Sequence, residues 1–133
     1  MPRILAPLII ALFMFPAVAM GQALDFSDLE RRDGIFFKKF TSVPFTGSVT
    51  GGIRGSFTNG KLDGPWVEYW GNGQVHSKGS FKSGKPVEMW VTYHENGQLL
   101  SQGSFNDGKP TGSWIWYTKS GRKVSTLDQA FKD

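Results

Sequence analysis

Few side chains in this chain are suited to catalysis or metal binding. The chain has no Cys and only two histidines, His76 and His94. Without Cys there is no thiolate nucleophile and no thiolate metal site. The chain also lacks a Gly-x-Ser-x-Gly sequence and a phosphate-binding glycine loop before a helix. A metal held by the two histidines across strands is the weaker alternative to two ordinary polar side chains. We therefore predict no catalytic residue, no metal and no cofactor, which means no enzyme.

The aromatic side chains are the stronger candidates, because flat rings bind sugars and the side chains of partner proteins. Trp70 and Trp116 occur at offsets that the rest of the chain does not repeat. They are candidates for an exposed platform, with packing at an edge or cap as the alternative. A row of tyrosines forms a ladder that is either packed or exposed. The candidate binding residues are Trp70, Trp116, Tyr69, Tyr93, Tyr117 and His94.

Basic residues gather near the glycine turns and at the end of the chain. They serve either solubility and protection of sheet edges or attraction of an acidic partner or anionic lipid. The formal net charge is only +4 at pH 7, too weak and too scattered for nucleic acid. The residues are Lys61, Lys82, Lys85, Lys109, Lys119, Arg122 and Lys123.

These candidate residues belong to a repeat with a period of 24 residues. Three copies are clear from Gly55 onward, and a shortened, degenerate copy precedes them between Pro44 and Gly55. A residue kept in every copy is best explained by the stacking of each repeat on its neighbours. We assign this structural role to Trp66, Trp90, Trp114, Phe57, Phe81, Phe105, Gly60, Gly73, Gly84, Gly97, Gly108 and Gly121.

Each copy contains two glycine turns, represented by Asn59-Gly60 and Asn72-Gly73. Asn-Gly and Asp-Gly favour type I′ turns, which need a positive φ at both central residues. The turn glycines alternate 13 and 11 residues apart, which leaves room for strands of about 5 to 8 residues. The predicted fold class is all-β, an elongated antiparallel β-meander of stacked hairpins in a single twisted sheet.

Side chains alternate along a strand, so Trp66, Glu68 and Trp70 point to one face and Tyr69 to the other. If Asn72-Gly73 is a two-residue loop, Gly71 pairs with Gln74 and Trp70 with Val75. An indole that covers a glycine on the neighbouring strand shields the backbone. The expected covers are Trp66 over Gly79 and Trp90 over Gly103.

Prolines lie near the start of every Trp-bearing strand, where a missing backbone donor is tolerated. A glycine follows or precedes the proline in two copies, and Glu88 takes its place in the third. We expect a kink or bulge at these points, so that the sheet coils. The residues are Pro65, Pro86 and Pro110, with Gly64, Glu88 and Gly112.

The first residues have the pattern of a targeting segment. Arg3 precedes an apolar run of about 15 residues, short of the roughly 20 that a spanning helix needs. We interpret residues 1–23 as a cleaved Sec-type signal peptide, cut after Ala23 or after Ala19, with an uncleaved anchor as the alternative. No Cys follows for lipid attachment, and losing Arg3 lowers the formal charge from +4 to +3. We expect a periplasmic or secreted protein.

The remaining chain divides into a lead-in with the degenerate repeat (24–54), the repeats (55–126) and a tail (127–133). The pattern Gly60-Lys61-Leu62-Asp63-Gly64-Pro65-Trp66, continued by Tyr69 and Asn72-Gly73-Gln74, resembles the variant form of the MORN repeat. The stretch 32–47 is similar to the lead-in of the antitoxin-like (YwqK-type) members of that family. The resemblance implies stacked hairpins and association with proteins or membrane lipids, and no activity.

Three functions remain open from the sequence. The first is protein binding in the cell envelope, of an antitoxin or immunity type, with a partner of unknown identity. The second is binding of cell-wall carbohydrate, although Trp-x-x-Tyr spacing sends its rings to opposite faces. The third is contact with anionic lipid through the basic residues. Nucleic acid is excluded as a partner.

Overall fold

The computed structural model describes residues 24–133. The signal segment predicted for residues 1–23 and its cleavage point therefore lie outside the described residues. Short strands joined by tight turns make up most of the chain. In order, the elements are β1 (Leu24–Asp25), η2 (Phe26–Asp28), β2 (Leu29–Arg32), β3 (Ile35–Lys38), β4 (Gly47–Thr50), β5 (Ile53–Thr58), β6 (Lys61–Tyr69), β7 (Val75–Lys82), β8 (Lys85–Tyr93), β9 (Leu99–Asn106), β10 (Lys109–Tyr117), β11 (Lys123–Val124) and α1 (Leu127–Ala130).

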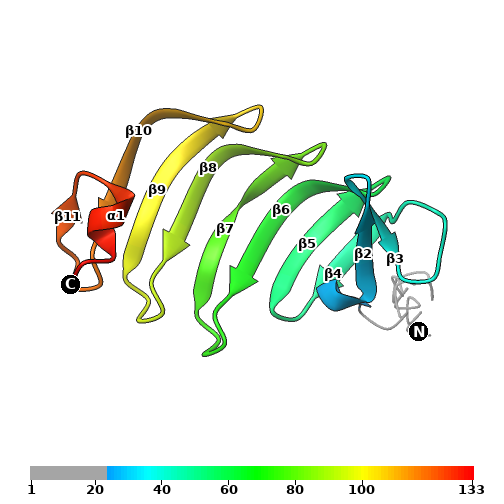
Figure 1. Cartoon of the computed structure of the whole chain (residues 1–133), viewed down its shortest axis with the longest axis horizontal. Coiled ribbons are helices and arrows are strands. Elements are labelled where there is room, and N and C mark those ends of the chain that lie inside the picture. The colour runs from blue at the N-terminus through cyan, green and yellow to red at the C-terminus, as the bar shows by residue number, and fades with distance from the viewer. Residues whose placement is uncertain (1–23) are drawn as a thin grey trace, which may run out of the picture.

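The predicted β-meander is confirmed. Nine strands form one sheet in the order β1-β4-β5-β6-β7-β8-β9-β10-β11, and from β4 onward every neighbour is the next strand along and antiparallel. The sheet is twisted and open (Figure 1). Two features were not expected: β1 pairs with β4 in parallel, and β2 and β3 form a separate two-stranded sheet. This small sheet lies in front of one end of the large one, and α1 lies in front of the other (Figure 1).

One series of turns has the predicted type I′ geometry. Asn59 has a φ of +49° and Gly60 a φ of +77°, the two positive values that this turn requires. A hydrogen bond also joins this type of turn to the preceding repeat: the Gly84 N–H donates to the Leu62 carbonyl (2.7 Å). The same φ pattern occurs at Asp33-Gly34, Ser83-Gly84 and Asp107-Gly108.

The other series is not type I′, so that expectation is wrong. Gly73 has a positive φ of +85°, whereas Asn72 does not. The Gly73 N–H donates to the Trp70 carbonyl (2.9 Å) and the Trp70 N–H donates to the Gln74 carbonyl (2.7 Å). The loop therefore holds three residues, in the usual form of a turn followed by a left-handed glycine. Gly97 and Gly121 occupy the same position in the next two turns.

This longer loop changes the register beside the turn. Trp70 faces Gln74, so the expected pairs of Gly71 with Gln74 and Trp70 with Val75 are wrong. A β-bulge next to the loop then adds one residue to the returning strand and offsets the difference. Beyond the bulge the predicted pairs are present: Trp66 with Gly79 and Trp90 with Gly103.

The indoles do not cover the glycines that were expected. A Cβ placed on Gly79 would lie 2.2 Å from the ring of Trp90, so the closest ring comes from the following strand and not from Trp66. The Trp90 Nε1 donates to the Ser80 carbonyl on β7 (3.2 Å), which draws this ring toward the preceding hairpin. The observed covers are Trp66 on Gly55, Trp90 on Gly79 and Trp114 on Gly103.

The predicted kinks lie where the prolines indicated. Gly64, Glu88 and Gly112 all have positive φ values, +101°, +60° and +66°. A shift of register occurs beside each of them in the ladder with the preceding strand. Glu88 holds this conformation without the freedom of glycine, so its backbone is strained.

The core is small and lies toward the N-terminal end of the sheet. Leu29, Val49, Phe57 and Trp66 are buried together. Leu29 comes from the small sheet, so the lead-in supplies one side of this core. Partly buried apolar residues surround it: Leu24, Phe26, Phe36, Phe45, Ile53, Leu62, Phe81 and Trp90.

Candidate binding surface

One face of the large sheet carries a continuous row of aromatic rings, and we call it the front face. The rings alternate Phe and Trp, because each pair of strands contributes one of each. Neighbouring rings meet edge to face, an arrangement that aromatic pairs favour. The centroid distances are 5.6 Å for Trp66–Phe81, 5.0 Å for Phe81–Trp90, 6.3 Å for Trp90–Phe105 and 5.1 Å for Phe105–Trp114.

The chain covers one end of this row with its own lead-in. Phe26 from η2 meets Trp66 edge to face at 5.9 Å, and Phe36 from β3 meets Phe57 at 5.2 Å. Leu29 completes the cover, and Phe57 is only 2% exposed as a result. The front face therefore accepts a hairpin that presents apolar side chains.

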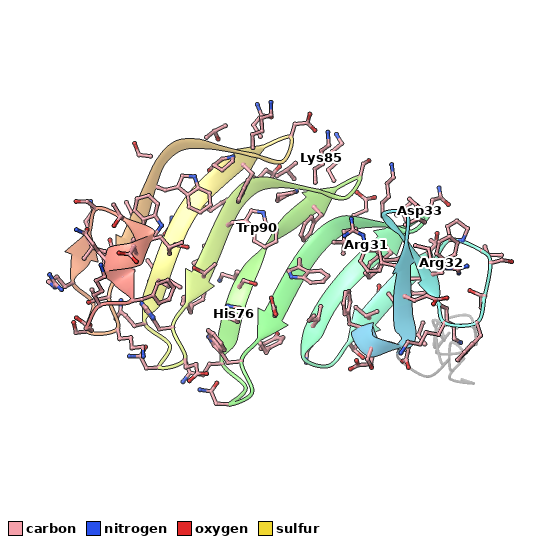
Figure 2. The ribbon with its side chains drawn as sticks, viewed as in Figure 1. Arg31, Arg32, Asp33, His76, Lys85 and Trp90 are labelled. Carbon is pink, nitrogen blue, oxygen red and sulfur yellow. The ribbon has the colours of Figure 1, made fainter. Side chains whose placement is uncertain are left out.

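The middle of the row has no such cover within the described residues. Phe81, Trp90, Phe105 and Trp114 are only half-buried, whereas Phe57 and Trp66 are buried. Trp90 lies on the viewer's side of the strands in Figure 2, in the open stretch between the small sheet and α1. This open stretch, defined by these four residues, is the candidate binding surface.

A second row on the front face is polar. Ser77 lies between Glu68 and Thr92 in the ladder and donates to the Glu68 carboxylate (3.3 Å). Thr92 and Ser101 share a hydrogen bond at 2.5 Å. Trp116 pairs with Ser101 and so occupies this row in β10, where it is half-buried.

Equivalent side chains tie each three-residue turn to the next one. The Trp70 Nε1 donates to the Tyr93 carbonyl (3.0 Å), and the Asn72 amide donates to the Glu95 carbonyl (2.8 Å). One repeat later, His94 occupies the position of Trp70. Its Nε2 lies 2.8 Å from the Tyr117 carbonyl, and since a carbonyl only accepts, this nitrogen carries the proton.

A small apolar pocket lies beside these turns, on the front face. Trp70 stacks on His76 with ring centroids 4.0 Å apart, and His94, only 3% exposed, lies behind them. Phe131 meets the His94 ring edge to face at 6.2 Å. The volume is about 280 Å³, and the lining residues are Trp70, His76, His94, Glu95, Leu100, Lys119 and Phe131.

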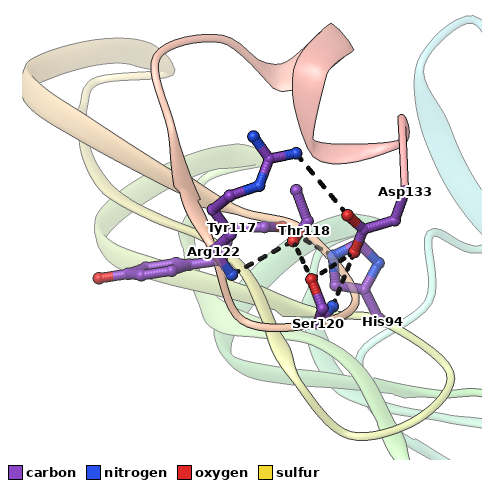
Figure 3. A network of polar contacts seen from close by, with 6 residues as sticks. All are labelled: His94, Tyr117, Thr118, Ser120, Arg122 and Asp133. Carbon is purple, nitrogen blue, oxygen red and sulfur yellow. Dashed lines mark hydrogen bonds and ion pairs between the residues drawn. The ribbon is translucent and has the colours of Figure 1, made fainter.

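The tail closes this end of the sheet through a carboxylate network (Figure 3). Asp133 accepts from the Ser120 N–H (2.8 Å) and from the Ser120 hydroxyl (2.7 Å). Its carboxylate also lies 3.8 Å from the Arg122 guanidinium. The hydroxyl and N–H of Ser120 hold the pKa of Asp133 below its ordinary value. We call this contact of Asp133 with Ser120 and Arg122 the latch. Thr118 and Ala130 are fully buried beneath it.

The opposite face of the sheet carries the tyrosines. Arg54 lies over the Tyr69 ring at 5.3 Å from its centroid, and Lys78 over the Tyr93 ring at 5.8 Å. Tyr69, Tyr93 and Tyr117 are all half-buried. Two of the three rings, Tyr69 and Tyr93, are thus partly covered by cationic side chains.

The structure separates the predicted binding residues into two groups. Trp70 and His94 line one pocket, and Trp116 shares their face, whereas Tyr69, Tyr93 and Tyr117 lie on the other face. Sequence reasoning missed His76 and Phe131 as members of that pocket. In the sequence, His76 is distinguished only by its place just after a turn. The β-bulge that brings it beside Trp70 cannot be recognised from the spacing of the residues.

The chemical repertoire of the described residues is limited. The His76 Nδ1 lies 3.6 Å from the Glu68 carboxylate, an ion pair only when the imidazole is protonated. Within residues 24–133, no three side chains of His, Cys, Asp or Glu gather closely enough to hold a metal ion. In the same residues, no helix is both long enough and apolar enough to span a membrane.

The repeats agree with a known family. The family model described as "MORN repeat variant" matches residues 62–83, which span β6 and β7 except for Lys61, and residues 89–107, which span the second half of β8 and all of β9. Two of the repeats are therefore similar to the MORN repeat variant. Such repeats are generally non-enzymatic binding modules. No curated protein matches the chain.

Proposed function

We propose that this chain is a non-catalytic module of the cell envelope that binds a protein partner on the open stretch of its front face. The observation that carries the proposal is the way the chain's own small sheet packs. It places Phe26, Phe36 and Leu29 on Phe57 and Trp66. The repeats that follow present the same kind of Phe–Trp pair with no such cover among residues 24–133.

The partner that fits is a polypeptide segment with apolar side chains along one face. The aromatic row offers a line of rings spaced by the strands, roughly 4.8 Å per strand. In the polar row beside it, Ser77 and Ser101 are buried and already hydrogen-bonded, which leaves the aromatic row as the contact surface. An antitoxin or immunity role, in which this contact neutralises an envelope protein, follows from the resemblance and from the predicted signal segment.

Site-specific photo-cross-linking tests this proposal. A photoreactive residue at Phe105 on the front face should capture one defined protein in the intact envelope. The same residue at Met89, which is exposed and lies on the opposite face, is the matched control and should capture none. Equal capture from both faces, or no capture at Phe105, would refute the assignment of the front face.

The captured protein must then bind the purified chain. We expect Phe105→Ser to weaken its affinity at least tenfold, since a central aromatic commonly contributes about 2 kcal/mol or more to an interface. Met89→Ser should leave the affinity unchanged. Circular dichroism of both variants checks that they remain folded.

A second candidate is the binding of a cell-wall sugar, favoured by the apolar pocket that holds the Trp70 ring. Trp rings and polar rims are common in such sites. However, the Trp70 ring already stacks on His76 and its Nε1 is bonded to Tyr93. Co-sedimentation with purified peptidoglycan, lost in Trp70→Ala, would support this candidate. A chain that stays in the supernatant excludes it.

A further inference from the structure

The loop between β3 and β4 exposes two large apolar side chains. We call residues 39–44 the tip loop. Phe40 is 101% exposed and Val43 is 72% exposed, more than any other large hydrophobic residue that the structure describes. The loop extends from the N-terminal end of the sheet (Figure 1), away from the open stretch of the front face.

The tip loop is held in a defined shape. The Thr41 N–H and hydroxyl both donate to the Lys38 carbonyl, at 3.1 Å and 2.7 Å. The Lys39 N–H donates to the Asp28 carbonyl (2.9 Å), and the Arg32 guanidinium donates to the Thr41 carbonyl. Pro44 forms an isolated bridge with Phe37. The exposure of Phe40 therefore results from a turn that four hydrogen bonds maintain.

The backbone of Phe40 is strained. Its φ is +65°, a left-handed value that is an outlier for a bulky residue. Asn tolerates this conformation far better. A phenylalanine that is both strained and fully exposed contributes little to the stability of the fold, so its apolar ring points to a contact outside the chain.

Cationic side chains lie directly behind the apolar tip. Lys38 and Lys39 are exposed and precede Phe40, and Arg32 stacks on Phe37 at 3.9 Å from its centroid. The acidic groups nearby are Glu30, which lies 3.4 Å from Arg32, and Asp28, whose carboxylate accepts from the Asp25 N–H. Within the described part of the chain, Lys38 and Lys39 form no ion pair, so their charges are available to an external anion.

We propose that the tip loop docks on an anionic phospholipid surface, with Phe40 and Val43 entering the headgroup–acyl boundary and Lys38 and Lys39 contacting the phosphates. Aromatic rings favour this boundary, and each Lys near an anionic surface adds attraction. The cations beside the apolar tip favour a phosphate-bearing surface over an apolar pocket in a protein. Docking at the tip loop leaves the front face open to its partner.

A fluorescent label at a single position tests this contact directly. The chain has no Cys, so Val43→Cys accepts one environment-sensitive dye, and Met89→Cys provides a control on the sheet. Vesicles of phosphatidylethanolamine mixed with phosphatidylglycerol should shift the emission of the dye at position 43 to the blue. Emission at position 89 should not change. No shift at position 43, or equal shifts at both positions, would overturn the proposal.

Substitutions then separate the apolar and ionic contributions. Phe40→Asn should lower the partition coefficient on these vesicles about tenfold, since a ring removed from an apolar phase loses that much. Because Asn accepts a positive φ, the unfolding temperature should stay the same or rise, which excludes misfolding as the cause. Lys38→Gln with Lys39→Gln should weaken partitioning by roughly fivefold for each charge and reduce its salt dependence.

Vesicles of phosphatidylcholine alone show whether the charge of the lipid matters. We expect much weaker partitioning on them. Equal partitioning on both lipids, or a Phe40→Asn variant that partitions like the unchanged chain, contradicts the proposal. All variants are made in the full chain, so residues 1–23 contribute equally to every measurement.

Discussion

Single residues set how closely the hairpins pack, and glycine is required where an indole lies against the backbone. Replacing Gly79 with Ala would place a Cβ 2.2 Å from the Trp90 ring. We expect a loss of about 1–3 kcal/mol in the free energy of unfolding, measured with urea. Gly71→Ala is the matched control, because no atom of residues 24–133, its chain neighbours apart, lies within 4 Å of its Cβ position. Equal losses in both variants would show that the ring contact is not the cause.

A second residue-scale prediction concerns the turn-to-turn hydrogen bonds. The Asn96 amide donates to the Lys119 carbonyl (3.0 Å) and its oxygen accepts from the Gln98 N–H (3.0 Å). Asn96→Ala should cost about 1 kcal/mol or slightly more, since both bonds are lost. Asn106→Ala, at the end of β9 and exposed, should change the urea midpoint little. An unchanged midpoint in Asn96→Ala would contradict the role of this bond.

The residue scale also shows the limits of sequence reasoning. The pairing of Trp66 with Gly79 was predicted from a two-residue loop that the structure does not have. The pair is present because a β-bulge adds one residue to β7 and offsets the longer loop. The direction in which each indole leans could not be predicted, because nothing in the residue spacing distinguishes the two neighbouring strands. Trp90 donates to the Ser80 carbonyl, but Trp114 leans the same way without a hydrogen-bond partner for its Nε1 among the described residues. Likewise His76 could not be placed beside Trp70, since a bulge of one residue determines its position.

At the scale of elements, the docking of the tail through Asp133 is expected to depend on pH. The pKa of Asp133 is lowered by the hydroxyl and N–H of Ser120, so the docked tail favours the ionised carboxylate. The docking free energy is then fully present above the ordinary Asp pKa of about 3.9. It is lost as the pH falls through the lowered value. The protection of the Ser120 amide, its exchange rate compared with that of an unstructured peptide at the same pH, should fall in that acidic window.

The control for this prediction is Asp133→Asn. That variant should exchange faster at neutral pH and show little further change in the acidic window. Asp25 also has a lowered pKa, because its carboxylate accepts from Ser27, so global stability will fall in acid in both chains. The difference between the two chains isolates the latch. No difference would mean that the carboxylate does not hold the tail.

The elements themselves were largely predictable, and the exceptions have local causes. Asn59-Gly60 and its equivalents are type I′ as their sequence indicates. The dipeptide Asn72-Gly73 has the same sequence but adopts a longer loop. The Asn72 side chain donates to the Glu95 carbonyl of the next repeat and accepts from the Gln74 N–H. Contacts between repeats therefore override the local preference of the dipeptide.

For the whole molecule, the sheet behaves as a linear series of similar units. Deleting residues 75–98 removes one complete period and joins Gln74 to Leu99, the equivalent of Val75. We expect this chain to fold with reduced stability, since each unit contacts only its neighbours. Circular dichroism and the unfolding temperature test it.

Deleting residues 75–97 instead is a strict control. It leaves one extra residue, which would send every following side chain to the opposite face. We expect this chain to aggregate or remain unfolded. If both deletions behave alike, the front face and its register do not govern folding.

Each indole covers a glycine on the preceding strand, so the strands of the sheet are covered in a fixed order. A chain is made from its N-terminus, and each glycine of the row is covered by a Trp that comes 11 residues later: Gly55 by Trp66, Gly79 by Trp90 and Gly103 by Trp114. The glycine of a newly formed hairpin thus stays uncovered until the Trp-bearing strand of the next hairpin has been made. During synthesis or export, only the backbone at the last glycine of this row is then exposed, because a Trp ring already covers each earlier glycine.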